Sequence, residues 1–274
     1  MTRQTLTSSR ARWVAVAIAV LLIGWVVGVA LWGAGRDPSP VGSPEQPRGS
    51  LESPKDAPEV IPEATAAPEI LEQVVQEQIA QLRAMPKTEP DPRLSDRIPS
   101  EARSHPDLYA AEFVRVLLTQ DYGRPRQEIL TWVATEAATT AEPLVVGLVP
   151  PELRDRLAVY SVAEQSSGPD SSPVPSAAEW ARLAALRGYT TVTDIRVSEP
   201  LAWSNAVDAG RVTDPGVTAR EITATVTLHT TAAGVTSAAR SSVSLIADFV
   251  GPPTRPSWGF VNVVLYTSLP EGRS

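Results

Sequence analysis

Few side chains in this chain of 274 residues are of the types that carry out catalysis or bind metals. The chain has no cysteine and two histidines, His105 and His229. Without thiols there is no disulfide, iron–sulfur cluster, cysteine nucleophile or cysteine-based zinc site, and two histidines cannot build a His-rich metal centre. His105 precedes a proline and is predicted to be a helix cap or an exposed residue, whereas His229 lies on a threonine-rich strand face and is predicted to be at the surface. We therefore predict no metal site and no cofactor.

Short motifs of nucleotide, metalloprotease and hydrolase sites are also missing: there is no phosphate-binding glycine-rich loop, no HExxH and no nucleophile elbow. A basic cluster is formed by Arg124, Arg126, Arg154 and Arg156, but acidic residues are interleaved with them. The chain has a net charge of −7 and a pI near 5.0. This pattern is typical of a solvated mixed surface and not of a nucleic-acid-binding face. We expect no catalytic residue and no direct contact with nucleic acid.

The first element along the chain is a hydrophobic segment. Residues 13–34 contain neither a charge nor a proline. As a helix they would be about 33 Å long, enough to cross a hydrocarbon core of roughly 30 Å. Residues 1–12 carry arginines and no acid, so the positive-inside rule keeps this tail cytoplasmic and places the rest of the chain outside the cell membrane. A cleaved signal peptide is the alternative, but its apolar region usually spans only about 7–15 residues.

Two proline-rich segments separate this anchor from the rest of the chain. Residues 35–68 hold eight prolines and six acidic residues, and few large apolar groups. Such a segment cannot bury enough apolar surface to offset its chain entropy, so we predict an extended linker that reaches on the order of 100 Å. Residues 86–99 contain four prolines and mixed charge, and are predicted to be a second linker.

Residues 69–85 lie between the two linkers and predict an amphipathic helix. Their apolar residues recur at spacings of three and four, with Pro68 before the segment and Pro86 after it. An isolated helix of about four turns is marginal in water, so its apolar stripe needs a partner. One alternative is docking on the following domain, and the other is a short coiled coil that self-associates. The candidate oligomerisation residues are Leu71, Val74, Val75, Ile79 and Leu82.

Residues 100–274 have a globular composition and change from a helical to a strand period at Gly188. Helices are predicted over 106–118, from 125 to 133, from 150 to either 157 or 160, and over 177–187. Strands are predicted over 189–198, 221–229, 241–250 and 258–266, joined by short turns that imply antiparallel neighbours. In the last strand, simple alternation places Phe260, Val264 and Tyr266 on one face, and Val263 on the other. This order predicts one α+β domain of three or four helices packed on a curved antiparallel sheet of about four strands.

The order of these parts resembles a known family. A single anchor and a proline-rich linker are followed by residues 107–119 (DLYAAEFVRVLLT), 126–133 (RQEILTWV) and 258–264 (WGFVNVV). This arrangement resembles the TcpC-type conjugal transfer proteins, which are similar to the bitopic inner-membrane assembly factors of type IV secretion systems. The resemblance implies a nuclear-transport-factor-2-like outer domain. It also implies a non-enzymatic, oligomerising component of a DNA-transfer channel, whose partners are other membrane subunits.

The implied fold can also host enzymes, in a conical pocket with an aspartate base and tyrosine donors. The candidates here would be Asp194, Asp248, Tyr109, Tyr189 and Tyr266. Asp248 alternates with Phe249 and is expected to face solvent, which weakens the case for catalysis. Many actinobacterial membrane-anchored proteins share the layout, so a cell-envelope accessory protein, for example of a lipid-import system, is an alternative. A ligand-binding or enzymatic domain is a further one.

Overall fold

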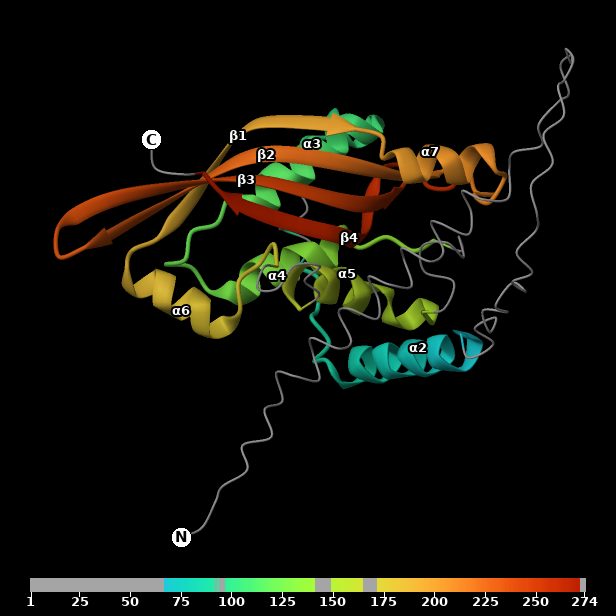
Figure 1. Cartoon of the computed structure of the whole chain (residues 1–274), viewed down its shortest axis with the longest axis horizontal. Coiled ribbons are helices and arrows are strands. Elements are labelled where there is room, and N and C mark those ends of the chain that lie inside the picture. Colours follow the sequence, from blue (N-terminus) through green and yellow to red (C-terminus); the bar gives the residue numbers. More distant parts are fainter. Residues whose placement is uncertain (1–66, 92, 94–96, 141–148, 165–171, 272–274) are drawn as a thin grey trace, which may run out of the picture. The chain divides into compact units, whose positions relative to one another are not determined.

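The computed structural model of the chain describes residues 67–91, 93, 97–140, 149–164 and 172–271 (Figure 1). The predicted tail 1–12, the anchor 13–34 and residues 35–66 of the predicted linker lie outside these residues, whereas residues 67 and 68 belong to a helix. Within the described part, no helix is both long enough and apolar enough to cross a membrane. The segment from Glu69 to Ser274 forms one compact unit.

This unit is built from helices and one sheet. The α-helices are α2 (Ala67–Ala84), α3 (Pro106–Leu118), α4 (Arg126–Glu136), α5 (Arg154–Ala163), α6 (Ala177–Ala185) and α7 (Leu201–Asp208), and two short 3₁₀ helices are η2 (Ala102–Ser104) and η3 (Pro151–Leu153). The helix predicted over 69–85 is present as α2. Helix α7 was not predicted from the sequence, although Pro200 precedes it and Gly210 follows it.

Local sequence explains where the helices start. Helix α3 begins with Pro106 in its first turn, and the Nδ1 atom of His105 accepts a hydrogen bond from the backbone N–H of Asp107 at 3.3 Å. The Ser176 hydroxyl accepts from the N–H of Glu179 at the start of α6. Both side chains satisfy backbone donors that have no partner inside the helix. The prediction that His105 caps a helix is confirmed.

The sheet has four strands in sequential antiparallel order: β1 (Tyr189–Ser198), β2 (Val217–Ala232), β3 (Val235–Val250) and β4 (Gly259–Pro270). The α+β class with a four-stranded antiparallel sheet is therefore as predicted. Strands β2 and β3 pair along their whole lengths, and their common end extends past β1 and β4 (Figure 1). The turn between them contains Ala233 and Gly234, both with positive φ, as a two-residue hairpin turn of primed type requires.

The main core lies between the helices and one face of the sheet. The predicted inward residues Ile222 and Ala224 of β2 are buried there, as are Val243, Leu245 and Ala247 of β3. Aromatic rings fill the centre: Tyr109, Phe113, Trp132, Phe249 and Phe260 are all 0% exposed. Phe113 and Phe260 stack with their ring centroids 4.2 Å apart.

Strand β4 departs from the predicted alternation. Its register against β3 shifts twice, between Ile246 and Ala247 and between Asp248 and Phe249. Each shift inserts an extra residue, and a single extra residue reverses the facing of every residue that follows. As a result Val263 is buried in the main core, whereas Val264 is 47% exposed. The prediction that Val264 faces the same side as Phe260, and Val263 the other side, is wrong for this reason.

Helix α2 is joined to this unit by a second, smaller core. Ile79 and Leu82 pack there with residues of α5, η3 and the sheet, among them Leu153, Leu157 and Val250. Arg156 of α5 donates hydrogen bonds to the carbonyl oxygens at the end of α2, at 3.2 Å to Leu82. The last turns of α2 are therefore held by the chain's own domain.

Candidate functional site

The residues that could have formed a catalytic pocket do not come together. Tyr109 and Tyr266 are both buried in the main core. Tyr266 lies on the edge strand β4. Asp194 and Tyr189 lie on β1, where Asp194 has a φ of 55° at a bulge and Tyr189 is 46% exposed. Asp248 alternates with Phe249 and so lies on the sheet face opposite the aromatic core. Neither of the two pockets described below is lined by Tyr109 or Tyr266.

Asp248 does not face solvent as expected; it is only 4% exposed. Its neighbours on the same face are also covered: Ala219, its direct partner on β2, and Val250, two residues further along β3, are both buried. Both faces of the sheet are therefore covered at this end, which a strand pattern alone does not reveal. Burial raises the pKa of the Asp248 carboxyl to about 7, because the low-dielectric surroundings disfavour its charged form.

A buried polar cluster joins α3, α4 and η2. The Glu136 carboxylate accepts two hydrogen bonds from the Arg103 guanidinium, at 2.7 and 2.9 Å, and one from the Tyr109 hydroxyl at 2.8 Å. Burial, and then the nearby Glu136 charge, raise the pKa of Tyr109 well above its ordinary value, so this hydroxyl keeps its proton. The Glu136 carboxylate is thus occupied by hydrogen bonds from Arg103 and Tyr109. This arrangement is typical of a structural ion pair.

The sequence analysis did not identify Glu136 as a buried polar residue. It lies four residues after Trp132 and three after Val133, on the stripe of α4 that faces the core. An acidic residue on an inward stripe is a signal that a buried partner is needed. The partners themselves, Arg103 and Tyr109, lie 33 and 27 residues earlier, and only the tertiary fold brings them close.

Most arginines of the predicted basic cluster stabilise the fold through hydrogen bonds within the chain. Arg126 donates to the carbonyl oxygen of Pro175 at 2.7 Å, Arg154 to that of Thr140, and Arg156 to the end of α2. Arg154 is buried, and burial lowers its pKa from the usual value. The interpretation of these residues as a solvated surface is therefore wrong for Arg154. Three of the four arginines tie segments together through backbone carbonyls.

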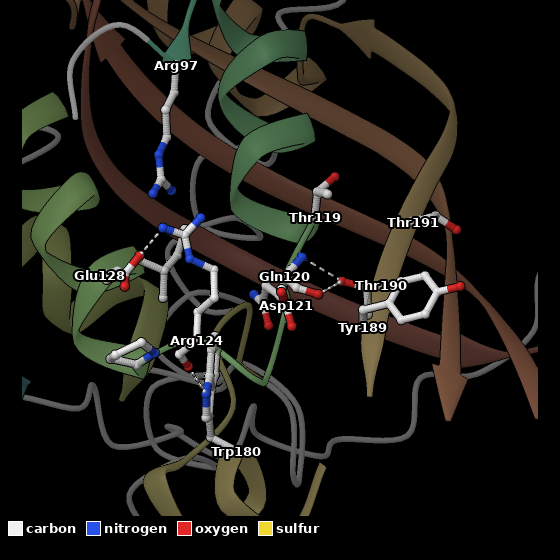
Figure 2. A pocket seen from close by; sticks show the side chains of 12 residues that line it. Arg97, Thr119, Gln120, Asp121, Arg124, Glu128, Trp180, Tyr189, Thr190 and Thr191 are labelled. Carbon is white, nitrogen blue, oxygen red and sulfur yellow. Dashed lines mark hydrogen bonds and ion pairs between the residues drawn. The ribbon is translucent and has the colours of Figure 1, made fainter. Parts of the chain in front are cut away.

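The described residues do contain a surface pocket of about 490 Å³ (Figure 2). It is lined by five separate pieces of chain: Arg97, the end of α3 with the residues after it, the start of α4, α6, and the start of β1. The second hollow, about 390 Å³, lies on the outer face of the sheet and is lined mainly by serine and threonine.

Hydrogen bonds hold together the chain segments that line the surface pocket. The Thr190 hydroxyl accepts from the backbone N–H of Gln120 at 2.8 Å and donates to the carbonyl of Leu118 at 2.6 Å. The Trp180 indole N–H donates to the carbonyl oxygen of Arg124 at 3.0 Å. The segment after α3 is thereby held against β1 and α6, and the pocket is built into the fold (Figure 2).

Two arginines and one glutamate form the charged side of this pocket. Arg124 makes an ion pair with Glu128 at 2.7 Å, and the side chain of Arg97 reaches the same place from above in Figure 2. No hydrogen bond or ion pair joins the Arg97 guanidinium to another residue in the described part of the chain. Burial, and then the charge of Arg124, lower the pKa of Arg97 from its usual value, whereas Glu128 acts in the opposite direction.

The remaining predicted residues have local roles. His229 stacks on Tyr189 with the ring centroids 4.6 Å apart, and its Nε2 atom lies 3.1 Å from the hydroxyl of Thr191. Of the five candidate oligomerisation residues, Ile79 and Leu82 are buried in the chain's own second core. The side chains of the other three (Leu71, Val74 and Val75) lie outside the described residues. No group of three or more metal-binding side chains occurs in the ranges described.

Comparison with known proteins gives no relative: no protein-family model, no curated protein and no solved structure matches this chain.

Proposed function

We propose that this chain is a non-enzymatic, membrane-anchored component of a conjugative DNA-transfer channel of the type IV secretion kind. In this proposal residues 13–34 cross the cell membrane, residues 1–12 remain in the cytoplasm, and the domain of residues 100–274 assembles with other membrane subunits outside. Support comes from the order of the parts: an apolar N-terminal segment, a proline-rich stretch, and helices followed by a sequential antiparallel sheet.

The observation that carries the proposal is the filled interior. In the enzymes of a nuclear-transport-factor-2-like fold, the reaction would take place in the hollow between the helices and the sheet. Here that space holds five fully buried aromatic rings, and the buried Glu136 is bound by Arg103 and Tyr109. Such an interior offers binding surfaces on the outside of the domain and favours assembly over catalysis. The helices-then-sheet order is likewise our reason for proposing this fold family.

Crosslinking of the full-length chain in its own membranes tests the proposal. The chain lacks cysteine, so a single introduced thiol reports its own contacts. We expect Val75→Cys, on the predicted apolar stripe, to form a disulfide-linked dimer under mild oxidation. Glu77→Cys, at an exposed position of the same helix, is the matched control and should form much less.

Partners are identified by mass spectrometry after crosslinking. Membrane subunits of a transfer apparatus among the crosslinked proteins, together with loss of DNA transfer when the chain is deleted, support the proposal. Monomers alone, with normal transfer after deletion, contradict it. Recovery of a lipid permease or of wall-synthesis enzymes would instead favour a cell-envelope accessory protein.

A further inference from the structure

The charged side chains that line the surface pocket between α3, α4, α6 and β1 are two arginines and two acidic residues, and they are unevenly arranged. Two guanidinium groups, those of Arg97 and Arg124, reach the same side of it, and Glu128 is the described acidic residue that lies beside them (Figure 2). The other acid that lines the pocket, Asp121, accepts a hydrogen bond from the backbone N–H of Gly123 at 3.0 Å. Among the described residues, Arg124 is paired with Glu128, whereas the Arg97 guanidinium makes no ion pair.

Arg97 is the group that an added anion would satisfy. Its side chain is half-buried, and no described residue gives it a hydrogen bond or an ion pair. A partly desolvated guanidinium beside a second one is unfavourable, and an oxyanion between the two relieves both the repulsion and the missing hydrogen bonds. The planar fork of N–H donors matches a carboxylate or phosphate group with two parallel hydrogen bonds.

We propose that this pocket is a binding site for a small molecule that carries a carboxylate or phosphate group, held by Arg97 and Arg124. This inference is independent of the channel proposal, since it concerns a ligand of the domain itself. Glu128 orients Arg124 through their 2.7 Å ion pair and leaves Arg97 as the main anion-binding residue.

The size and lining of the rest of the pocket indicate the chemical character of the ligand beyond its anionic group. A volume of about 490 Å³ is much larger than one oxyanion needs and falls in the range of small-molecule sites. Ile129 and Trp180 supply apolar surface, and hydroxyl groups of Thr119 and Thr191 lie on the opposite side (Figure 2). We therefore expect an aromatic anion such as phenyl phosphate or benzoate to bind more tightly than inorganic phosphate or acetate.

Protection of arginines from phenylglyoxal tests the site in the unmodified full-length chain. The chain is treated with this guanidinium-specific reagent with and without each of the four anions, and modified peptides are quantified by mass spectrometry. Arg97 and Arg124 should be protected about fivefold or more by the better ligand. Arg93, whose side chain is 90% exposed and paired with Asp91, and Arg115, paired with Glu112, serve as internal controls and should not change.

A calorimetric titration of variants completes the test. Arg97→Gln should weaken binding of the aromatic anion by about tenfold or more, since a charge-assisted hydrogen bond is lost, whereas Arg93→Gln should bind as the original chain does. Stronger protection by phenyl phosphate than by benzoate assigns a phosphate ligand, and the reverse assigns a carboxylate. Equal protection of all four arginines, protection of none, or unchanged binding by Arg97→Gln would overturn the proposal. The protection result stands even if the variant does not fold.

Discussion

At the residue scale, several buried or partly buried polar side chains are bound by other groups of the chain. Glu136 accepts from Arg103 and from the Tyr109 hydroxyl, and the Arg126 and Arg154 guanidiniums bind backbone carbonyls. Removing one partner of such a buried pair leaves an uncompensated charge, which costs more than the pair contributes. These residues are therefore required for the fold, and their burial alone does not indicate catalysis.

Asp248 gives a pH dependence of stability whose sign follows from its raised pKa. The unfolded chain loses this proton near its ordinary value of 3.8, whereas the folded protein keeps it up to about 7. Between these values the folded state binds more protons, so this group's contribution to the free energy of unfolding is full below pH 4 and falls as pH rises to 7. The total is on the order of 4 kcal/mol.

Asp248→Asn should remove this pH dependence. Urea unfolding of both proteins between pH 4 and 7 should show the original chain losing stability relative to the variant as pH rises. Asp208→Asn, at an exposed position at the end of α7, controls for the loss of an acidic residue. A difference between Asp248→Asn and the original chain that stays constant across this pH range would contradict the raised pKa.

At the scale of elements, β4 shows what bulges do to a strand. The two register shifts place Val263 in the core, at 2% exposure, and Val264 outside, at 47%. With one cysteine introduced into a chain that has none, Val264→Cys should react with a maleimide about tenfold faster or more than Val263→Cys, because reaction at a buried site requires local opening. An unbulged strand would reverse the order, and full unfolding in urea should make the two rates equal.

Docking of α2 makes a second element-scale prediction. Leu82 is 2% exposed, so Leu82→Ala should lower the free energy of unfolding by about 2–5 kcal/mol through lost burial and a residual cavity. Gln78→Ala, at an exposed position of the same helix, should change it by less than about 0.5 kcal/mol. Chemical denaturation measures both. If both variants changed the free energy of unfolding by the same small amount, α2 would not be packed against the domain in solution.

Features of the fold that are determined by neighbouring residues could be predicted from the sequence, whereas features that depend on distant residues could not. The inward residues of β2 and β3 follow from alternation, and the start of α3 follows from His105 and Pro106, because both signals lie in neighbouring residues. The bulges of β4 were not predictable, since they depend on which residues of β3 stand opposite. The burial of Asp248 likewise depends on packing against a second face of the sheet.

The pocket could not be predicted for a related reason. Arg97, Trp180 and Tyr189 are far apart in sequence and belong to different elements. Nothing about Arg97 in the sequence distinguishes it from other arginines of a proline-rich segment. Only the pairing of the segment after α3 with β1, through residues such as Thr190, brings these side chains to one cavity.

At the scale of the whole molecule, charge and hydrophobicity are divided along the chain. The tail of residues 1–12 is basic, residues 13–34 are uncharged, and residues 100–274 contain 19 acidic and 14 basic side chains. Positive charge that precedes an apolar segment favours retention of the N-terminus in the cytoplasm. An acidic domain joined through a proline-rich segment is then expected on the opposite side of the membrane.

Labelling of intact cells with a membrane-impermeant maleimide tests this orientation. Ser237→Cys lies at an exposed position on the β2–β3 hairpin, and Ser9→Cys lies in the basic tail. Ser237→Cys should be labelled in intact cells, whereas Ser9→Cys should be labelled only after lysis, because the reagent does not cross the bilayer. A cytoplasmic thiol protein that stays unlabelled shows that the cells are intact. Labelling of Ser237→Cys only after lysis would place the domain inside the cell, and the channel proposal would then fail together with the anchor on which it rests.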